Sequence, residues 1–139
     1  MRLSKGFSLL ELLVALFILS IGLLGVVPLA ITTIRLNAFQ NQLLNAKFLA
    51  ERQAEYLKSI SFDSQDLSND GDNSDLDNTI NPDHNIIRVM DNITYNVMWN
   101  IAENPDGTRT VNIIVQWRSA PRGTIKTYNV TFVRSSYEI

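Results

Sequence analysis

The stretch that decides the fold is residues 5–31, KGFSLLELLVALFILSIGLLGVVPLAI. Between residues 7 and 34 the only charged side chain is that of Glu11. A helix of this length, at about 1.5 Å per residue, is long enough to cross a hydrocarbon layer of roughly 30 Å. Arg2 and Lys5 precede it, and basic residues beside a membrane span stay on the cytoplasmic side. The segment therefore predicts a membrane-spanning helix whose amino terminus is cytoplasmic.

The carboxylate of Glu11 is the feature that an ordinary membrane anchor leaves unexplained. A lone ionised group in lipid costs at least about 2.5 kcal/mol, so it indicates a functional site. A cleaved secretory signal has an apolar region of about 7 to 15 residues that ends at small residues. The segment here is longer and continues into a helical pattern. This favours a retained anchor over a secretory signal.

The motif KGFSLLE at residues 5–11 resembles the type III signal of type IV pilins and pseudopilins. In that family a short basic leader ends in Gly, Phe follows, and Glu is the fifth residue after the cut. The resemblance implies that a prepilin peptidase cleaves between Gly6 and Phe7 and methylates the new amino group of Phe7. It also implies that Glu11 pairs with the protonated amino terminus of a neighbouring subunit, which makes two charges in lipid tolerable. A stray Glu in an ordinary anchor is the alternative.

Gly22, Gly25 and Pro28 interrupt the apolar segment, and both residue types weaken a helix. The resemblance implies local unwinding at this place in an assembled filament. Packing of small residues in a membrane helix is the alternative. Residues 15–25, ALFILSIGLLG, are most similar to the PilV group of minor pilins and more distantly to the minor pseudopilins of type II secretion.

Beyond residue 35 the pattern becomes amphipathic, and no Gly or Pro occurs between residues 29 and 63. This predicts one continuous helix from Phe7 to about Ile60, whose second half covers a globular head. A soluble coiled coil is the alternative for this half. The apolar positions that recur every three or four residues are Leu36, Phe39, Leu43, Ala46, Ala50, Ala54 and Leu57.

Three later stretches alternate with a period of two, and turn motifs NPDG (104–107) and APRG (120–123) separate them. They predict an antiparallel meander with one apolar face, to which residues 86–90 add a short fourth strand. The expected fold class is thus α+β and type IV pilin-like, with a long N-terminal helix packed against a 3–4-stranded antiparallel sheet. Trp99 and Trp117 are expected in its core rather than as a platform for stacking bases. The apolar sets are Tyr95, Val97, Trp99 and Ile101; Val111, Ile113, Val115 and Trp117; and Tyr128, Val130 and Phe132.

We expect five segments along the chain. They are a leader peptide (1–6), a hydrophobic transmembrane and assembly half of the helix (7–34), its amphipathic half (35–62), an acidic connecting loop (63–85) and a sheet head (86–139). The chain has no cysteine, so it has neither a disulfide nor a thiolate metal site.

Residues 63–78, DSQDLSNDGDNSDLDN, form the most acidic part of the chain. Hard cations such as calcium take several carboxylate and carbonyl oxygens, and Asp70, Asp72 and Asp75 could approach one ion around the turn at Gly71. The full EF-hand pattern is missing. A solvated, partly mobile connector is the simpler interpretation, and calcium is the alternative. In either case we expect a contact surface for partners here.

Residues 63–91 hold eight Asp and one Arg, whereas residues 107–139 hold five basic residues and one Glu. This suggests contact between the two segments or between copies of the chain, not affinity for nucleic acid. His84 is the only histidine, and a surface loop residue is expected rather than a catalyst or zinc ligand. No Gly loop for phosphate is found, so we expect no enzyme.

The leading expectation is a minor type IV pilin of the PilV group that acts in assembly initiation or at the pilus tip. The alternatives are a minor pseudopilin of type II secretion and, from another class, a membrane-anchored module that binds calcium or another ligand. The expected partners are prepilin peptidase and other minor and major pilins. The expected location is the inner membrane, single-pass with a periplasmic head, and then the pilus or pseudopilus.

Overall fold

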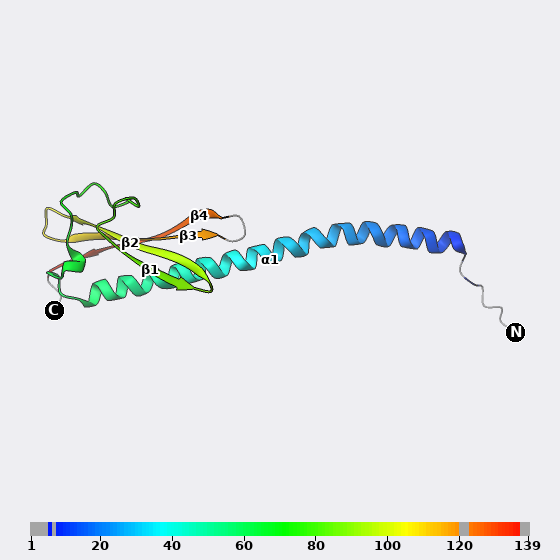
Figure 1. The fold of residues 1–139 in the computed structure, drawn as a ribbon, viewed down its shortest axis with the longest axis horizontal. Helices are drawn as coiled ribbons and strands as arrows, with labels where there is room; N and C mark the ends of the chain where they lie inside the picture. Colours follow the sequence, from blue (N-terminus) through cyan, green and yellow to red (C-terminus); the bar gives the residue numbers. More distant parts are fainter. Residues whose placement is uncertain (1–5, 7, 120–122, 137–139) are drawn as a thin grey trace. The chain divides into compact units, whose positions relative to one another are not determined.

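The computed structural model describes residues 6, 8–119 and 123–136. Its elements run in the order of one long helix, one short 3₁₀ helix and four strands, and Figure 1 labels the long helix and the strands. The predicted α+β arrangement, a long N-terminal helix packed against an antiparallel sheet, is confirmed. The bounds are α1 (Leu9–Ser59), η1 (Gln65–Leu67), β1 (His84–Met90), β2 (Ile93–Glu103), β3 (Arg109–Ser119) and β4 (Thr124–Arg134).

Helix α1 is continuous over 51 residues and contains Pro28. Its observed bounds differ by one or two residues from the predicted helix, and Phe7 lies outside the described residues. The chain divides into two compact units, residues 1–38 and residues 39–139.

In the first unit, every described residue of α1 from Leu9 to Ala38 is exposed. The helix has a window with a mean hydropathy of 2.8 and, by length and composition, is apolar enough to cross a membrane. Contiguous exposed apolar surface of this extent marks a site for lipid or for other protein.

In the second unit, the strands form one antiparallel sheet in the order β1-β2-β3-β4, which is the predicted meander. The β1–β2 connection is a two-residue turn in which Asp91 and Asn92 have φ of 50° and 61°. Two left-handed residues are the requirement of a type I′ hairpin turn. Asn45 of α1 donates a hydrogen bond to the Asp91 carboxylate at 2.7 Å, which ties this turn to the helix.

The other two turns fall where the sequence predicts them. Between β2 and β3, the amide of Gly107 donates to the carbonyl of Asn104 at 3.0 Å, and Gly107 has φ of +80°. Between β3 and β4, Gly123 has φ of +66°, and its amide donates to the Ser119 carbonyl. Residues 120–122 of this turn lie outside the described residues.

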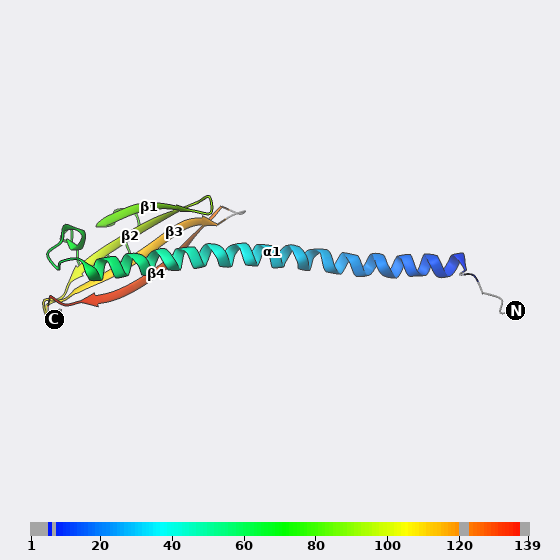
Figure 2. The ribbon, with the colours of Figure 1, turned by 90° about the horizontal axis from the view of Figure 1, so that it is seen from below.

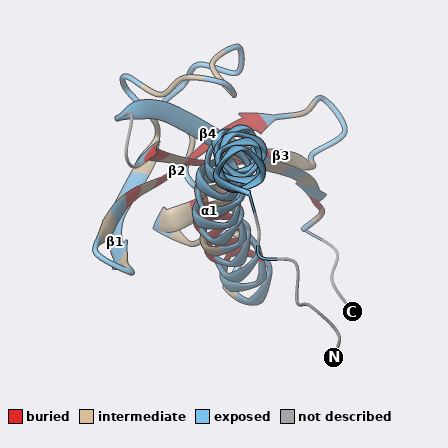
Figure 3. Ribbon diagram, turned by 90° about the vertical axis from the view of Figure 1, so that its right-hand side faces the viewer, coloured by how far each residue is buried: buried red, intermediate tan, exposed pale blue. Residues whose placement is uncertain are grey.

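The core lies between residues 39–59 of α1 and one face of the sheet (Figures 2 and 3). The predicted apolar sets of β2 and β3 are all buried, including Trp99 and Trp117, whereas the β4 set is half-buried because β4 is an edge strand. Helix residues spaced three or four apart face them, as the amphipathic pattern predicts from Phe39 onward, whereas Leu36 of the predicted set is 55% exposed. The buried helix residues of this core are Ala46, Leu49, Ala50, Ala54 and Leu57.

Two arginines of the sheet hold the carboxyl end of α1. The guanidinium of Arg134, which is 6% exposed, donates to the carbonyls of Leu57 and Ile60. Arg109 donates to the carbonyl of Phe62 at 2.6 Å and lies over its ring. The last carbonyls of a helix have no partners within it, so Arg134 satisfies one of them at Leu57, and Arg109 holds the chain just after the helix has ended.

Candidate functional site

Helix α1 begins at a serine cap. The side-chain oxygen of Ser8 accepts a hydrogen bond from the amide of Leu10 at 3.3 Å, and its carbonyl accepts the amide of Leu12 at 3.1 Å. Both contacts are those of an N-cap residue. Gly6 precedes the cap, is exposed, and has no atom within 4 Å of where a Cβ would stand. The predicted cleavage point thus begins in an accessible position, while Phe7 lies outside the described residues.

Glu11 lies in the first turn of α1 and is exposed. Ser8 and Glu11 stand in the S-x-x-E spacing of a capping box, which is a signal that the sequence interpretation did not use. A carboxylate in the first turn is also favoured by the helix dipole, by typically 0.3–1 kcal/mol. Within the described part of the chain, however, the Glu11 carboxylate has no hydrogen-bond or ion-pair partner. The Glu11 carboxylate can therefore favour the start of the helix and still bind a group from outside the described residues.

The predicted flexible region is helical. α1 runs through Gly22, Gly25 and Pro28 without a break, and neither glycine has another atom within 4 Å of a Cβ position. The hydroxyl of Thr32 donates to the carbonyl of Pro28 at 2.9 Å. Within the described part of the chain, the two glycines therefore leave open space on the surface of the helix. Unwinding in a filament stays a prediction.

The acidic loop, which we define as residues 63–83, is attached to the second face of the sheet. Its later part lies on the side opposite α1 in Figures 1 and 3. The attachment centres on Asn100 of β2, which is fully buried. Its side-chain amide donates to the carbonyls of three loop residues, Asp75, Leu76 and Asn78, at 2.8–3.1 Å.

A second buried asparagine supports the same attachment. Asn112 of β3, which is 2% exposed, donates to the carbonyl of Leu76 at 2.8 Å and to the Asp77 carboxylate at 3.0 Å. On this face Met98 and Ile114 are also buried. The interpretation of the loop as a mere solvated connector is therefore incomplete, because the loop also covers the second face of the sheet.

The loop also covers the part of β2 that β1 does not reach. The amide of Ile101 donates to the Asp83 carboxylate at 2.7 Å, and the amide of Glu103 donates to the side-chain oxygen of Asn73 at 2.7 Å. The amide of Asp83 in turn donates to the side-chain oxygen of Asn100 at 2.9 Å. Uncovered strand edges invite pairing with other chains, so these side chains protect the edge.

Three carboxylates meet in this loop. Oxygens of Asp70, Asp75 and Asp83 lie within 4.8 Å of one another. Asp70 and Asp75 belong to the set of three aspartates that the calcium alternative named; Asp83 takes the place of Asp72, whose carboxylate accepts the hydroxyl and amide of Ser74 instead. Sequence spacing misses Asp83 because the chain returns to β2 only through tertiary contacts. These oxygens are the type that a hard cation takes.

The charges of the loop perturb one another. Burial raises the pKa of Asp75, and the negative charges of Asp83, Asp70 and Asp72 raise it further. The hydrogen bonds from Ser74 lower the pKa of Asp72. The raised pKa of Asp75 means that ionising this carboxyl group destabilises the folded loop unless a cation offsets the negative charge.

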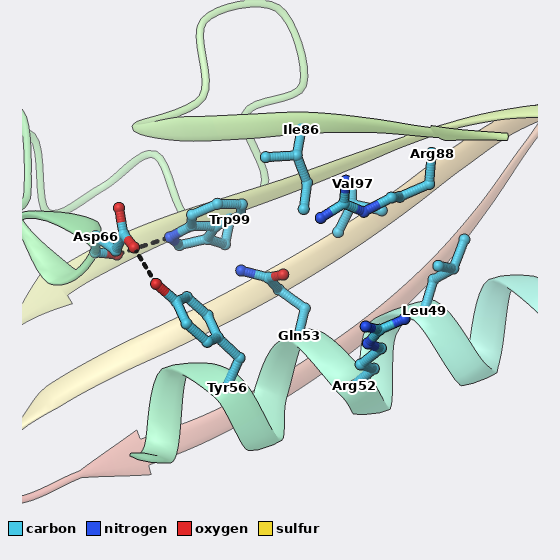
Figure 4. Close-up of a pocket in the computed structure, with 9 residues that line it drawn as sticks. All are labelled: Leu49, Arg52, Gln53, Tyr56, Asp66, Ile86, Arg88, Val97 and Trp99. Carbon is cyan, nitrogen blue, oxygen red and sulfur yellow. Dashed lines mark hydrogen bonds between the residues drawn. The ribbon is translucent and has the colours of Figure 1, made fainter. Parts of the chain in front are cut away.

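A groove of about 310 Å³ lies between α1 and β1 on the other side of the sheet (Figure 4). Apolar side chains of both elements and of β2 line its floor, and two arginines enter it, Arg52 from α1 and Arg88 from β1. Both arginines are exposed, and neither forms an ion pair or hydrogen bond with any described residue. The lining residues are Leu49, Arg52, Gln53, Tyr56, Asp66, Ile86, Arg88, Val97 and Trp99.

Gln53 is the unusual polar residue of this groove. Its side chain is 8% exposed and rises from α1 toward Val97 and Trp99 in Figure 4. No described residue forms a hydrogen bond with its amide. Because its side-chain nitrogen and oxygen still reach solvent, the amide is open to water or to a ligand that enters the groove.

One end of the groove is closed by a hydrogen-bonded cluster. The Asp66 carboxylate accepts the Tyr56 hydroxyl at 2.6 Å, and its carbonyl accepts the indole N–H of Trp99 at 2.8 Å. The hydrogen bond to Asp66 raises the pKa of Tyr56. His84, expected in a surface loop, instead begins β1, stacks on Trp99 at 5.2 Å between ring centroids, and contacts the Ser68 carbonyl through Nε2. It is therefore a packing residue of the strand.

Comparisons with known proteins give one kind of match. Residues 1–27 fit the family model described as the prokaryotic N-terminal methylation motif. No curated protein matches the chain, and no solved structure does. The matched segment contains Gly6, Phe7, Glu11 and the two glycines of α1.

Proposed function

We propose that the chain is a minor type IV pilin of the PilV group, a structural subunit for pilus assembly initiation or for the pilus tip. The observation that carries the proposal is the methylation motif at residues 1–27, placed on an exposed apolar helix that continues onto a sheet. The motif supports a type IV pilin-like or pseudopilin-like protein, and such proteins are structural rather than enzymatic. The PilV assignment rests on the resemblance of residues 15–25.

In this proposal, prepilin peptidase removes residues 1–6 and methylates the amino group of Phe7. Before assembly, residues 7–34 span the inner membrane once, with Arg2 and Lys5 cytoplasmic and the head in the periplasm. The exposed apolar side chains then exchange lipid for the helices of other minor and major pilins. Gly22, Gly25 and Pro28 would give this part of the helix some freedom to adjust.

Glu11 has the central role in the assembly step. Its carboxylate is exposed on an apolar helix and has no partner in the described part of the chain. In lipid such a charge costs at least about 2.5 kcal/mol, and a nearby opposite charge offsets much of that cost. The amino terminus of Phe7 on an adjacent subunit would supply this charge, which makes Glu11 a residue that sets register.

The test separates processing from assembly. The full chain would be expressed with prepilin peptidase, and its intact mass and N-terminus would be measured for wild type, Gly6→Ala and Glu11→Gln. We expect a mature chain that begins at methylated Phe7 in wild type and Glu11→Gln, and an uncut chain in Gly6→Ala. Glu11→Gln should be cut normally but should enter filaments poorly. An uncut wild-type chain, beside a control prepilin that is cut, would overturn the proposal.

A minor pseudopilin of type II secretion is the second candidate, since it would share the motif and the architecture. Deleting the gene would separate the two machines: loss of surface pili with intact protein secretion supports the pilin, and the reverse supports the pseudopilin.

A membrane-anchored calcium-binding module is the candidate from another class. The convergence of Asp70, Asp75 and Asp83 favours it. Calcium titration of the full chain tests it, with magnesium as the control cation. A rise in the unfolding temperature with calcium alone supports the module, and Asp75→Asn should abolish the rise.

A further inference from the structure

We propose that the groove between α1 and β1 receives the acidic loop of a second copy of the chain. Ile80 of that loop would enter the apolar part of the groove, and aspartates beside it would pair with Arg52 and Arg88. This inference rests on the proposed function, because it describes how one subunit contacts the next. It adds a contact between the globular heads of two subunits to the contact that Glu11 makes.

The groove has the chemistry of a site for an acidic, partly apolar segment. Arg52 and Arg88 bring two guanidinium groups to it, neither of which is paired within the described residues. Gln53 adds a side-chain amide that has no hydrogen-bond partner among the described residues and borders the groove, so it can donate to an incoming backbone or carboxylate oxygen. The floor is formed by apolar residues, of which Leu49 and Val97 are buried.

The acidic loop has the complementary chemistry. Residues 63–83 contain seven Asp and no basic residue, and Asp70, Asp72 and Asp77 are exposed. Ile80 is 96% exposed, the highest value among the exposed large apolar side chains of the described residues. A protruding apolar side chain on an acidic loop can act as an anchor that fills a pocket of a partner.

Asp66, at the start of the acidic loop, lines one end of the groove of its own chain and is hydrogen-bonded there to Tyr56, but the later part of the loop, which carries Ile80, cannot fill that groove. Asn100 and Asn112 hold residues 75–78 on the second face of the sheet, whereas the groove lies on the face that α1 covers. The two surfaces are different and complementary. Such a heterologous contact does not close on itself, so after two copies join, one groove and one loop stay open for a further subunit.

The experiment uses the full chain in the membrane of cells that contain prepilin peptidase. One copy carries Ile80→benzoylphenylalanine, a photoreactive side chain that is also apolar, and a second copy carries a different tag. We expect a photoproduct between the two copies whose attachment site maps to the groove residues of α1 or β1. The same photoreactive group at Thr127, an exposed residue of β4, serves as the control position and should give no such product.

Charge variants then test the pairing. Arg52→Glu with Arg88→Glu in the tagged copy should lower the yield by about ten-fold, whereas Arg118→Glu, an exposed arginine outside the groove, should not. Asp70→Lys with Asp72→Lys in the photoreactive copy should restore the yield against the Glu variant. Because these residues are exposed, membrane insertion and cleavage at Gly6 should be unchanged.

Several outcomes would overturn the inference. They are no product above the Thr127 control, a product that ignores the charge reversals, or a product made only with a different protein. An uncut chain would instead point to failure of the proposed function, and a cut chain without the product to failure of the groove contact alone. The two failures are therefore distinguishable.

Discussion

Replacement of Asn100 by Leu should release the acidic loop from the sheet without unfolding the head. The side-chain amide of Asn100 donates to three loop carbonyls and its oxygen accepts the amide of Asp83. The two N–H groups of the Asn100 amide are shared among three acceptors, so the side chain forms the equivalent of two to three full hydrogen bonds. At about 1 kcal/mol each, with a further cost for carbonyls that stay buried, the loss is roughly 2 to 4 kcal/mol. The helix–sheet core lies on the other face and should persist.

The assay is amide hydrogen exchange of the full chain in detergent micelles. The amides of Ile101 and Glu103, which donate to loop side chains, report whether the loop is in place. A loss of 2 to 4 kcal/mol corresponds to exchange that is roughly 30- to 700-fold faster. Asn129→Leu, an exposed position on the same face of β4, is the matched control and should leave these amides protected. Unchanged protection in Asn100→Leu would refute the view that this residue holds the loop.

Three further predictions concern the head. Arg134→Met should lower the free energy of unfolding by about 2 to 4 kcal/mol, because helix carbonyls lose a buried charged donor; urea unfolding followed by tryptophan fluorescence measures this, and an equal loss in exposed Arg118→Met would contradict it. The raised pKa of Asp75 means that its stabilising contribution is present below its ordinary pKa of about 4 and is lost as the pH rises through the folded value. Asp75→Asn should therefore be more stable than wild type near neutral pH, with a difference that disappears in acid; a constant difference across the pH series would refute this. Trp99→Phe removes the hydrogen bond to the Asp66 carbonyl and should cost about 1 kcal/mol or more in the same urea assay, whereas an unchanged midpoint would show that the bond contributes nothing.

Local patterns were sufficient for the helix, the strands and one face of the core. The period of three to four residues up to Leu57 and the alternation in β2 and β3 each report burial directly, and every residue of those two strand sets is buried. The turn at Asn104–Gly107 was also readable, because the backbone there needs a residue that tolerates positive φ. The β1–β2 turn was not singled out, since Asp91-Asn92 is a weaker signal than a glycine turn.

The second face of the sheet was not readable in the same way. Asn100 and Asn112 lie between the apolar residues of β2 and β3, at positions that are polar and exposed to solvent in most strands with an alternating pattern. The sequence therefore suggests that this face of the sheet is exposed to water. The two asparagines are buried because a loop from a distant part of the chain lies over them. His84 was misplaced for a similar reason: its neighbours Pro82 and Asp83 are typical of loops, but its pairing with Trp99 across β1 and β2 makes it a strand residue.

The sequence by itself determined the features that depend on near neighbours: the apolar run with a single carboxylate at Glu11, the motif around Gly6, and the periodicities of helix and strands. These follow from spacing alone, since residues three or four apart share a face of a helix and residues two apart share a face of a strand. Only the tertiary structure decided which groups from distant segments meet. It brings Asp83 to Asp70 and Asp75, and it places Arg52 and Arg88 along one groove. The physical reason is that hydrogen bonds between the loop and the sheet, and packing of α1 on β1, join segments whose separation in sequence carries no period.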